Sequence, residues 1–295
     1  FSRNPSQAIE EFSRVSVKDV PDIKVIKINE DIDAYRFLRK KIREYAISLG
    51  FAESEEDLNA FLNNFCIMLS SKRLEGSIGR DRLIMQAANA YEDVGRAANL
   101  FHERLYEWFS LHYPEVKNTK DFADNVVSYG RRENFPDFKK SVGVDINEQD
   151  EQILIEFATT MQTLTEEKEH IEKYIRTSIK EIAPNMSSLI DSMLAARLLS
   201  LAGSLEKLAR MPSSTIQLLG AEKALFRHLH KKGKSPKYGI LYTSSVIQNS
   251  KPEHRGKVAR ILAAQLMKAT RIDFYSGRYE PKIKEELEKE LKAIK

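Results

Sequence analysis

Few side chains in this sequence have the types and spacing that catalysis requires. Of the six histidines, His228 and His230 are the closest pair. Two residues apart on a helix, they face different directions, so we expect no shared metal ion there. A nuclease centre built from Glu222, Lys223 and His228 is the remaining enzymatic alternative, but no paired carboxylates accompany them. The sequence contains neither a glycine-rich dinucleotide loop nor a Walker motif. An enzyme is therefore the weakest interpretation.

Phosphate binding is the chemistry that the remaining polar side chains fit. Lys223, Arg227 and Lys231 recur every four residues and share one face of an expected helix. Gly220 precedes that helix and would let the backbone approach a ligand closely, while the exposed N–H groups of a helix start suit a phosphate. The loop that follows supplies flexible point charges suited to a sugar–phosphate backbone, at Lys231, Lys232, Lys234 and Lys237.

A second set of cations lies on the helix expected from about Pro252 onward. Lys257, Arg260, Lys268 and Arg271 fall at i, i+3, i+11 and i+14, which places them in one stripe beside the apolar face. Between the two basic regions, the stretch 238–242 is predicted to be a short strand whose tyrosines could stack on a base. An ordinary solvated basic face is the alternative interpretation of both groups.

The charge of the chain is unevenly distributed. Residues 210–278 contain 14 Lys and Arg against 3 Asp and Glu, whereas residues 1–209 contain 28 against 35. Residues 279–295 are balanced, with five of each sign. A basic block beside an acidic body is typical of a module that binds a polyanion, nucleic acid above all.

Two heptad patterns predict the elements that position this block. Apolar residues at alternating spacings of three and four run from Ile84 to Trp108, and a second such run extends from Phe157 to Ile182. Two long runs joined by a polar linker predict an antiparallel helical hairpin. Because one narrow stripe often pairs with another chain, we expect dimerisation through the positions Ile84, Tyr91, Val94, Phe101, Leu105, Trp108, Met161, Leu164, Ile171 and Ile175. An intramolecular bundle without a partner is the alternative.

The other segments give coarser predictions. Residues 22–28 read as a strand, 31–49 as a helix and 53–57 as an acidic helix start, which together resemble the remainder of an α/β domain. Residues 185–209 read as one core helix. Cys66, the only cysteine, is expected to be a buried small hydrophobe, and its isolation indicates a reducing compartment. No apolar run approaches the length of a membrane span.

The run PSSTIQLLGAEKALFRHL at 212–229 resembles the signature of the Nop domain. The resemblance continues through KYGILYTSSVIQNSKPEHRGKVARILAAQLMKATRIDFYSG at 237–277 and begins upstream with APNMSSLIDSMLAARLLSLAGSLEKLARM at 183–211. The hairpin before it also matches the family's order of an N-terminal domain, a coiled coil and a Nop domain. The sequence is similar to the archaeal Nop-family core proteins of box C/D guide RNPs and to the nucleolar Nop proteins of eukaryotes.

The resemblance implies a scaffold without catalytic residues or a cofactor of its own. Such proteins bind a box C/D guide RNA together with a ribosomal-type kink-turn-binding protein, and they position the methyltransferase fibrillarin, which carries S-adenosylmethionine, for 2′-O-methylation. The coiled coil joins two copies. By the same resemblance the contacts to RNA and to the kink-turn protein fall on Gly220, Ala221, Glu222, Lys223, Ala224, Leu225, Phe226, Arg227, His228 and the loop lysines.

The resulting expectation is a mainly α protein with four parts. These are a truncated fibrillarin-docking domain at 1–72, a coiled coil at 73–183, a Nop domain at 184–278 and a charged helix at 279–295. The first residue, Phe1, suggests that the sequence starts inside a longer protein, and the lysine-rich tail common in the family is not seen. We expect a cytoplasmic location in an archaeon and a nucleolar one in a eukaryote. A splicing-type Nop protein and a protein-binding coiled-coil scaffold are the alternatives.

Overall fold

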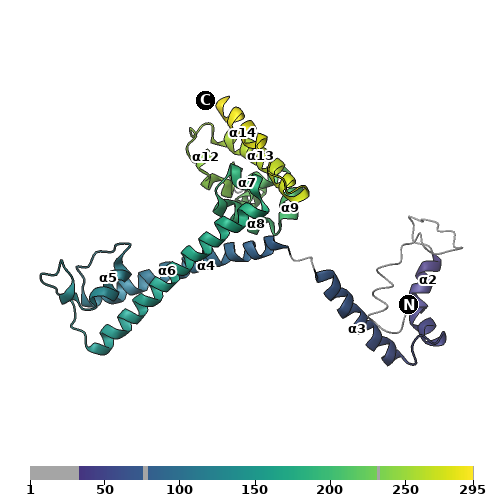
Figure 1. Cartoon of the computed structure of the whole chain (residues 1–295), viewed down its shortest axis with the longest axis horizontal. Coiled ribbons are helices and arrows are strands. Elements are labelled where there is room, and N and C mark those ends of the chain that lie inside the picture. Colours follow the sequence, from purple (N-terminus) through teal and green to yellow (C-terminus); the bar gives the residue numbers. More distant parts are fainter. Residues whose placement is uncertain (1–32, 76–78, 231–232, 295) are drawn as a thin grey trace. The chain divides into compact units, whose positions relative to one another are not determined.

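The computed structural model describes residues 33–75, 79–230 and 233–294, and within them every regular element is a helix. This confirms the mainly α prediction. The chain divides into two compact units, Phe1–Gly79 and Arg80–Lys295 (Figure 1). None of the described helices is both long enough and apolar enough to cross a membrane.

The first unit contributes two described helices, α2 (Asp33–Ser48) and α3 (Glu55–Leu74). Ser54 caps α3 by accepting a hydrogen bond from the Asp57 N–H, and three acidic residues follow in the first turn, as the sequence predicted. The strand predicted at 22–28 lies outside the described residues. The prediction for Cys66 was wrong, because its side chain is exposed on α3.

The second unit begins with a long hairpin of α4 (Arg80–His112) and α6 (Glu148–Ile182). The two helices run antiparallel, because Tyr91 donates a hydrogen bond to Glu172 while Phe101, farther along α4, stacks on Phe157. A capping box formed by Asn147 and Asp150 starts α6. The heptad pattern therefore predicted this hairpin correctly.

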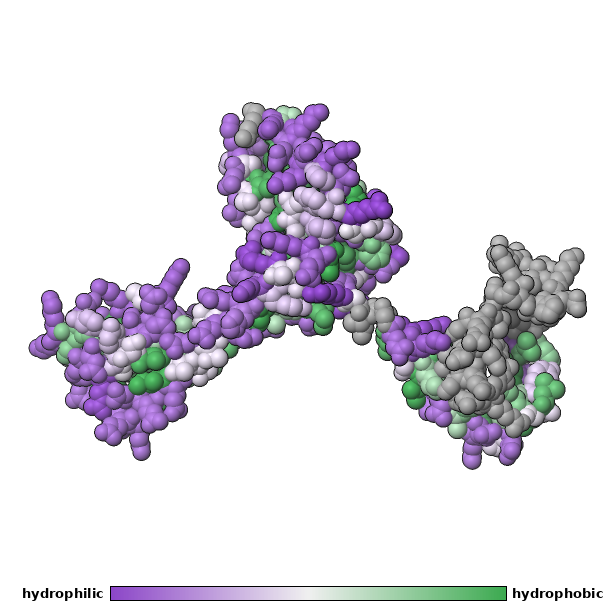
Figure 2. All heavy atoms as spheres, in the orientation of Figure 1, coloured by the Kyte–Doolittle hydropathy of each residue, from purple (hydrophilic) through white to green (hydrophobic). Residues whose placement is uncertain are grey.

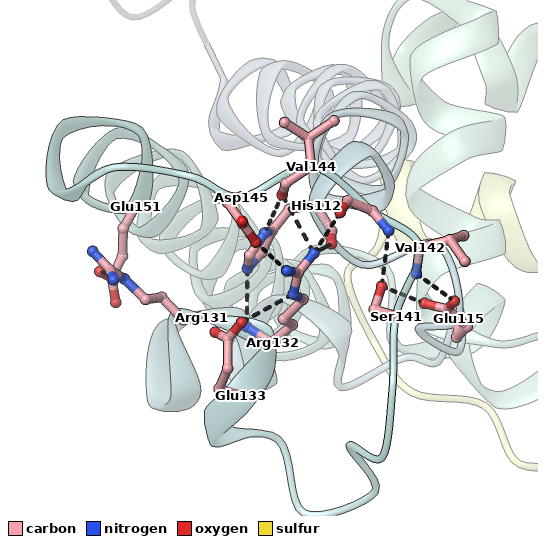
Figure 3. A network of polar contacts seen from close by, with 11 residues as sticks. His112, Glu115, Arg131, Arg132, Glu133, Ser141, Val142, Val144, Asp145 and Glu151 are labelled. Atoms are coloured by element: carbon pink, nitrogen blue, oxygen red, sulfur yellow. Dashed lines mark hydrogen bonds and ion pairs between the residues drawn. The ribbon is translucent and has the colours of Figure 1, made fainter.

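The far end of the hairpin is a small compact region that contains α5 (Phe122–Tyr129) and the short 3₁₀ helix η1 (Arg132–Asn134) (Figure 1). Its core is aromatic, with Phe109 and Phe122 fully buried. Arg132, itself buried, donates to the carbonyls of His112 (3.0 Å) and Gly143 (2.7 Å) and pairs with Asp145. Figure 3 shows these contacts converging on one guanidinium, which fastens the 135–146 loop to the end of α4.

The His112 imidazole makes two further hydrogen bonds that hold the same loop. Its Nε2 accepts the Arg132 N–H at 3.0 Å, so Nδ1 carries the proton and donates to the Val144 carbonyl at 2.7 Å. The imidazole thereby bridges η1 and the loop in its neutral form, with both nitrogens used (Figure 3).

A helical bundle follows the hairpin, and its first part differs from the prediction. Residues 185–209 form three helices rather than one, because Asp191 caps the second helix and Gly203 ends it with φ +88°. Ser204 then caps the third. These helices are α7 (Pro184–Leu189), α8 (Ser192–Ala202) and α9 (Leu205–Arg210).

The centre of the bundle is α13 (Arg255–Tyr275), which packs against α7, α9 and α10 (Ser213–Leu218). Its inner face is fully buried from Ala259 to Ala269. At its C-terminal end, the buried Asp273 carboxylate accepts hydrogen bonds from the Asn185 N–H and side chain and from the Met186 N–H. Because these N–H groups belong to the first turn of α7, Asp273 fixes the junction between hairpin and bundle.

The last helix, α14 (Lys282–Lys292), packs on α13 through the buried Ile283 and Leu287. This segment was predicted from the sequence to be a separate charged helix. In the structure its apolar face belongs to the same core as α13, while its charged face is exposed.

Candidate nucleic-acid interface

The basic helix predicted after Gly220 is α11 (Glu222–Leu229). Gly220 turns the chain into it with φ +81°, and a Cβ there would lie 3.3 Å from the Ile240 Cβ. The Ile240 N–H donates to the Leu219 carbonyl at 2.7 Å, so the turn is tied to residues 239–240. Gly239 is the tighter position, since a Cβ there would lie 1.9 Å from the Leu219 oxygen. Sequence reasoning singled out Gly220 but missed Gly239.

The start of α11 differs from the predicted phosphate site. Oε1 of Glu222 accepts the Gly220 N–H at 2.7 Å, so this donor is already used and a carboxylate occupies the helix start. A negative charge there opposes a second anion. The backbone at the start of α11 therefore suits a phosphate poorly, and the cationic side chains of the helix are the remaining candidates.

The outer surface of α11 combines cations with large apolar side chains. Lys223 and Arg227 are exposed and have no ion-pair partner within the described part of the chain. Phe226 and Leu229 are 65% and 68% exposed. Ala224, Leu225 and His228 are half-buried, and Nδ1 of His228 lies 3.0 Å from the Gly233 carbonyl. No residue of α11 is fully buried, so the helix presents most of its surface to solvent.

The lysine loop after α11 is described only in part. Lys234 and Lys237 are exposed, and the Lys237 carbonyl accepts a hydrogen bond from Gln217 at 2.6 Å. This bond fixes the end of the loop beside α10. Lys231 and Lys232 lie outside the described residues.

The strand predicted at 238–242 was wrong. The segment leads into a 3₁₀ helix, η2 (Ile240–Thr243), and Tyr238, which precedes this helix, stacks on Tyr242 with ring centroids 4.9 Å apart. Arg255 lies 5.7 Å from the Tyr242 ring centroid and donates to its hydroxyl at 3.2 Å. These rings therefore contribute to the fold, and base stacking on them stays a prediction.

The basic stripe on α13 divides into two halves. Lys257 and Arg260 are exposed, and neither forms an ion pair with any described residue. Lys268 instead pairs with Glu286 of α14 at 2.8 Å, and Arg271 donates to the Ala209 carbonyl at the end of α9 at 3.2 Å. Lys268 and Arg271 therefore also contact neighbouring helices, and RNA binding by the four residues stays a prediction.

The enzymatic alternative gains no geometric support. Glu222 and His228 are hydrogen-bonded to different backbone groups, Gly220 and Gly233, and not to each other. Among the described residues there is no group of three His, Cys, Asp or Glu side chains that could hold a metal ion.

The residues predicted to form a dimer interface lie mainly inside the hairpin. Ile84, Leu105 and Ile175 are fully buried within the single chain, and Met161 is 9% exposed. They are core residues of the α4–α6 contact and cannot touch another chain without unpacking it. Half-buried positions complete the same seam: Tyr91, Val94, Phe101, Leu164 and Ile171.

The heptad analysis found one residue, Trp108, of an exposed apolar patch at the hairpin tip and missed the others. We define the tip patch as Trp108, Leu111, Val142 and Val144, which are 39%, 66%, 83% and 68% exposed. The Val144 N–H donates to the Leu111 carbonyl at 2.8 Å, which brings the loop residues beside the end of α4. Figure 2 shows hydrophobic residues among the hydrophilic ones on the visible face of this region.

One protein-family model matches most of the second unit, Arg80–Lys295. The model of a family described as "Nop: snoRNA binding domain, fibrillarin" matches residues 90–293. An uncharacterized NOP5 family protein of Methanocaldococcus jannaschii is 33% identical over 90% of this chain and 70% of its own length. Nucleolar protein 58 of Schizosaccharomyces pombe is 32% identical over 82% of this chain, and nucleolar protein 56 of the same yeast is 33% identical over 66%.

The chain spans about half the length of these two nucleolar relatives, 52% and 45% respectively. Among solved structures, the crystal structure of a fibrillarin/Nop5p complex contains a chain that aligns with a TM-score of 0.52 at 24% identity, covering 93% of this chain and 96% of that one. At this identity the likeness supports the shared fold.

Proposed function

The chain belongs to the Nop family of snoRNA-binding, fibrillarin-associated proteins, and we propose that it is the scaffold subunit of a box C/D guide RNP. In this proposal it binds a kink-turn RNA together with a kink-turn-binding protein and positions fibrillarin for guided 2′-O-methylation. Fibrillarin carries out the S-adenosylmethionine-dependent methylation, and the role of this chain is to position fibrillarin on the RNA. The complex is cytoplasmic if the source is archaeal and nucleolar if it is eukaryotic.

The mixed surface of α11 is the observation that carries the proposal. Lys223 and Arg227, which have no ion-pair partner among the described residues, offer cations to phosphates, while Phe226 and Leu229 offer exposed apolar area on the same short helix. The Phe226 ring can stack on a base, whereas the exposed aliphatic side chain of Leu229 suits contact with a protein. A composite surface of RNA and protein uses both.

The α11 cations can be tested with a double variant. Lys223→Ala with Arg227→Ala should fold normally yet weaken ternary assembly by roughly 10²-fold at moderate salt, because two phosphate contacts are lost. The measurement is a fluorescence-anisotropy titration of a labelled kink-turn RNA already bound by its kink-turn protein. Lys282→Ala with Lys284→Ala, two exposed lysines of α14, is the matched control. Unchanged assembly by the α11 variant would reject the proposal.

We further propose that the chain forms a homodimer through the tip patch rather than through the buried heptad positions. Val142, Val144 and Leu111 are the most exposed apolar residues there, and Trp108 is less exposed. Covering them on a second copy removes apolar area from water at no cost to the hairpin core. Leu111→Glu should convert a dimer to a monomer in sedimentation velocity, whereas Leu83→Glu, an exposed leucine at the other end of α4, should not. A monomeric wild type would contradict this.

A further inference from the structure

A groove on the bundle lies apart from the residues discussed so far. It has a volume of about 750 Å³ and is bounded by α12 (Ser245–Gln248), the start of α13 and the end of α14. Figure 1 shows these three helices gathered in one part of the bundle. Volumes of this size hold several side chains of a bound ligand.

Four aliphatic side chains line this groove: Val246, Val258, Leu291 and Ile294. Val258 is almost fully buried, while the other three are half-buried, so part of this apolar surface faces the opening. His254 is the one aromatic ring among the described residues that line the groove, which include no Phe, Tyr or Trp. Nucleobases are commonly bound by stacking on aromatic rings, so the lining suits aliphatic side chains better than bases.

The polar rim is mainly basic. Lys251 lies on the α12–α13 side and Lys292 on the α14 side, both exposed, and neither has an ion-pair partner among the described residues. His254 adds an imidazole to the rim, and Glu288 is the one acidic residue among the described lining residues. Ser245 and Asn249 add hydrogen-bonding side chains. An occupant that is apolar at its centre and acidic at its edges therefore matches both chemistries.

Arg260 of α13 does not extend the groove toward RNA. It lies two residues beyond Val258, which places it about 200° around the helix from the groove side. A nucleic acid on Arg260 would thus occupy a different face of α13 from the groove.

We propose that this groove docks a short acidic segment of a partner protein, which inserts two aliphatic side chains between α13 and α14 and pairs carboxylates with Lys251 and Lys292. The mode is that of an amphipathic peptide laid in an apolar groove, with i and i+3 anchors and flanking charges. It goes beyond the function proposed above, because neither α11 nor the tip patch takes part.

The test uses the full chain and four labelled probes in fluorescence polarisation. They are the peptide Glu-Glu-Leu-Glu-Glu-Leu-Glu, the same peptide with serine for leucine, the same peptide with lysine for glutamate, and hexauridylate RNA. We expect only the first to bind below about 1 mM, the weak limit of specific association. Lys251→Glu and Ile294→Glu should each weaken it about tenfold, the first by charge repulsion and the second by a carboxylate in the apolar floor.

Lys282→Glu, an exposed lysine at the opposite end of α14, is the matched control and should bind like the wild type. Thermal unfolding of each variant establishes that it is folded. Three results would overturn the inference: no binding of the first peptide up to about 1 mM, binding that both groove substitutions leave intact, or hexauridylate binding that the same substitutions abolish. Each of these leaves the α11 experiment untouched, so the two proposals fail separately.

Discussion

At the scale of single residues, glycines set the geometry of the proposed RNA surface. Gly239→Ala would place a Cβ 1.9 Å from the Leu219 oxygen, and the backbone there cannot yield as a flexible side chain would. We predict a loss of about 1–3 kcal/mol in the free energy of unfolding, the usual cost of forced overpacking. Urea denaturation measures it. Gly233→Ala, where a Cβ meets nothing within 4 Å, should be close to neutral. Equal losses of stability in the two variants would show that the Leu219 oxygen does not restrict the side chain at position 239.

Asp273 is the second residue on which the arrangement depends. Burial raises the pKa of its carboxyl above the usual value, while the hydrogen bonds from Met186 and Asn185 act in the opposite direction. Asp273→Asn leaves one of these N–H donors facing an amide NH₂ group. We predict a loss of about 1–3 kcal/mol, the cost of an unsatisfied buried donor, measured as a lower urea midpoint. A variant as stable as the wild type would mean that the α7 start is satisfied in another way.

At the scale of elements, Arg132 joins the 135–146 loop to the hairpin. Its guanidinium satisfies the carbonyls of His112 and Gly143 inside the fold (Figure 3). Arg132→Met keeps the length of the side chain but removes every donor, so both carbonyls lose their partner. We predict a loss of about 3–5 kcal/mol, typical of a broken buried network. Because the bundle is separate from this tip, hydrogen exchange should quicken in residues 112–146 and stay slow in α13. Uniform acceleration across both regions would contradict the local role.

The ion pair at the junction of α6 and α8 (Ser192–Ala202) should make the stability of the fold depend on pH. Burial tends to raise the pKa of Asp191, but the Arg176 ion pair and the Met193 N–H outweigh it, so the pKa is lowered. A carboxyl whose folded pKa is depressed contributes stability above its unfolded pKa and loses it as pH falls through the folded one. Stability should therefore decline below about pH 4, the unfolded value of Asp. Asp191→Asn should flatten this part of the pH profile of the urea midpoint. The same slope in both proteins would exclude Asp191 as the cause.

The heptad spacing predicted the hairpin because its periodicity depends only on neighbours along one helix. The breaks at Asp191 and Gly203 were missed, since an apolar stripe can continue in phase across short helices. The strand expected at 238–242 failed because β-prone tyrosines there pack on each other in a 3₁₀ turn. The ion pair of Lys268 was missed because its partner Glu286 lies 18 residues away on another helix. Contacts between helices are not encoded in the spacing within either one.

At the scale of the whole molecule, this chain combines a rigid hairpin with a compact bundle that carries the basic surface. Lys223 and Arg227 lie beside apolar side chains on α11, and Lys257 and Arg260 lie on α13 without ion-pair partners in the described structure. Nonspecific attraction to phosphate is spread over these cations, whereas apolar contact is confined to a few positions. Such a surface should prefer an RNA that already carries its protein.

The most direct test of this account is a gel-shift titration with a box C/D kink-turn RNA, alone and bound by its kink-turn protein, at several salt concentrations. The account predicts tight binding to the preformed RNA–protein complex and weak binding to the free RNA. The affinity for the complex should retain a component that salt does not remove, because the apolar part of α11 contributes to it. Equal binding to any RNA, with a steep collapse as salt rises, would contradict the composite surface and leave only a basic patch.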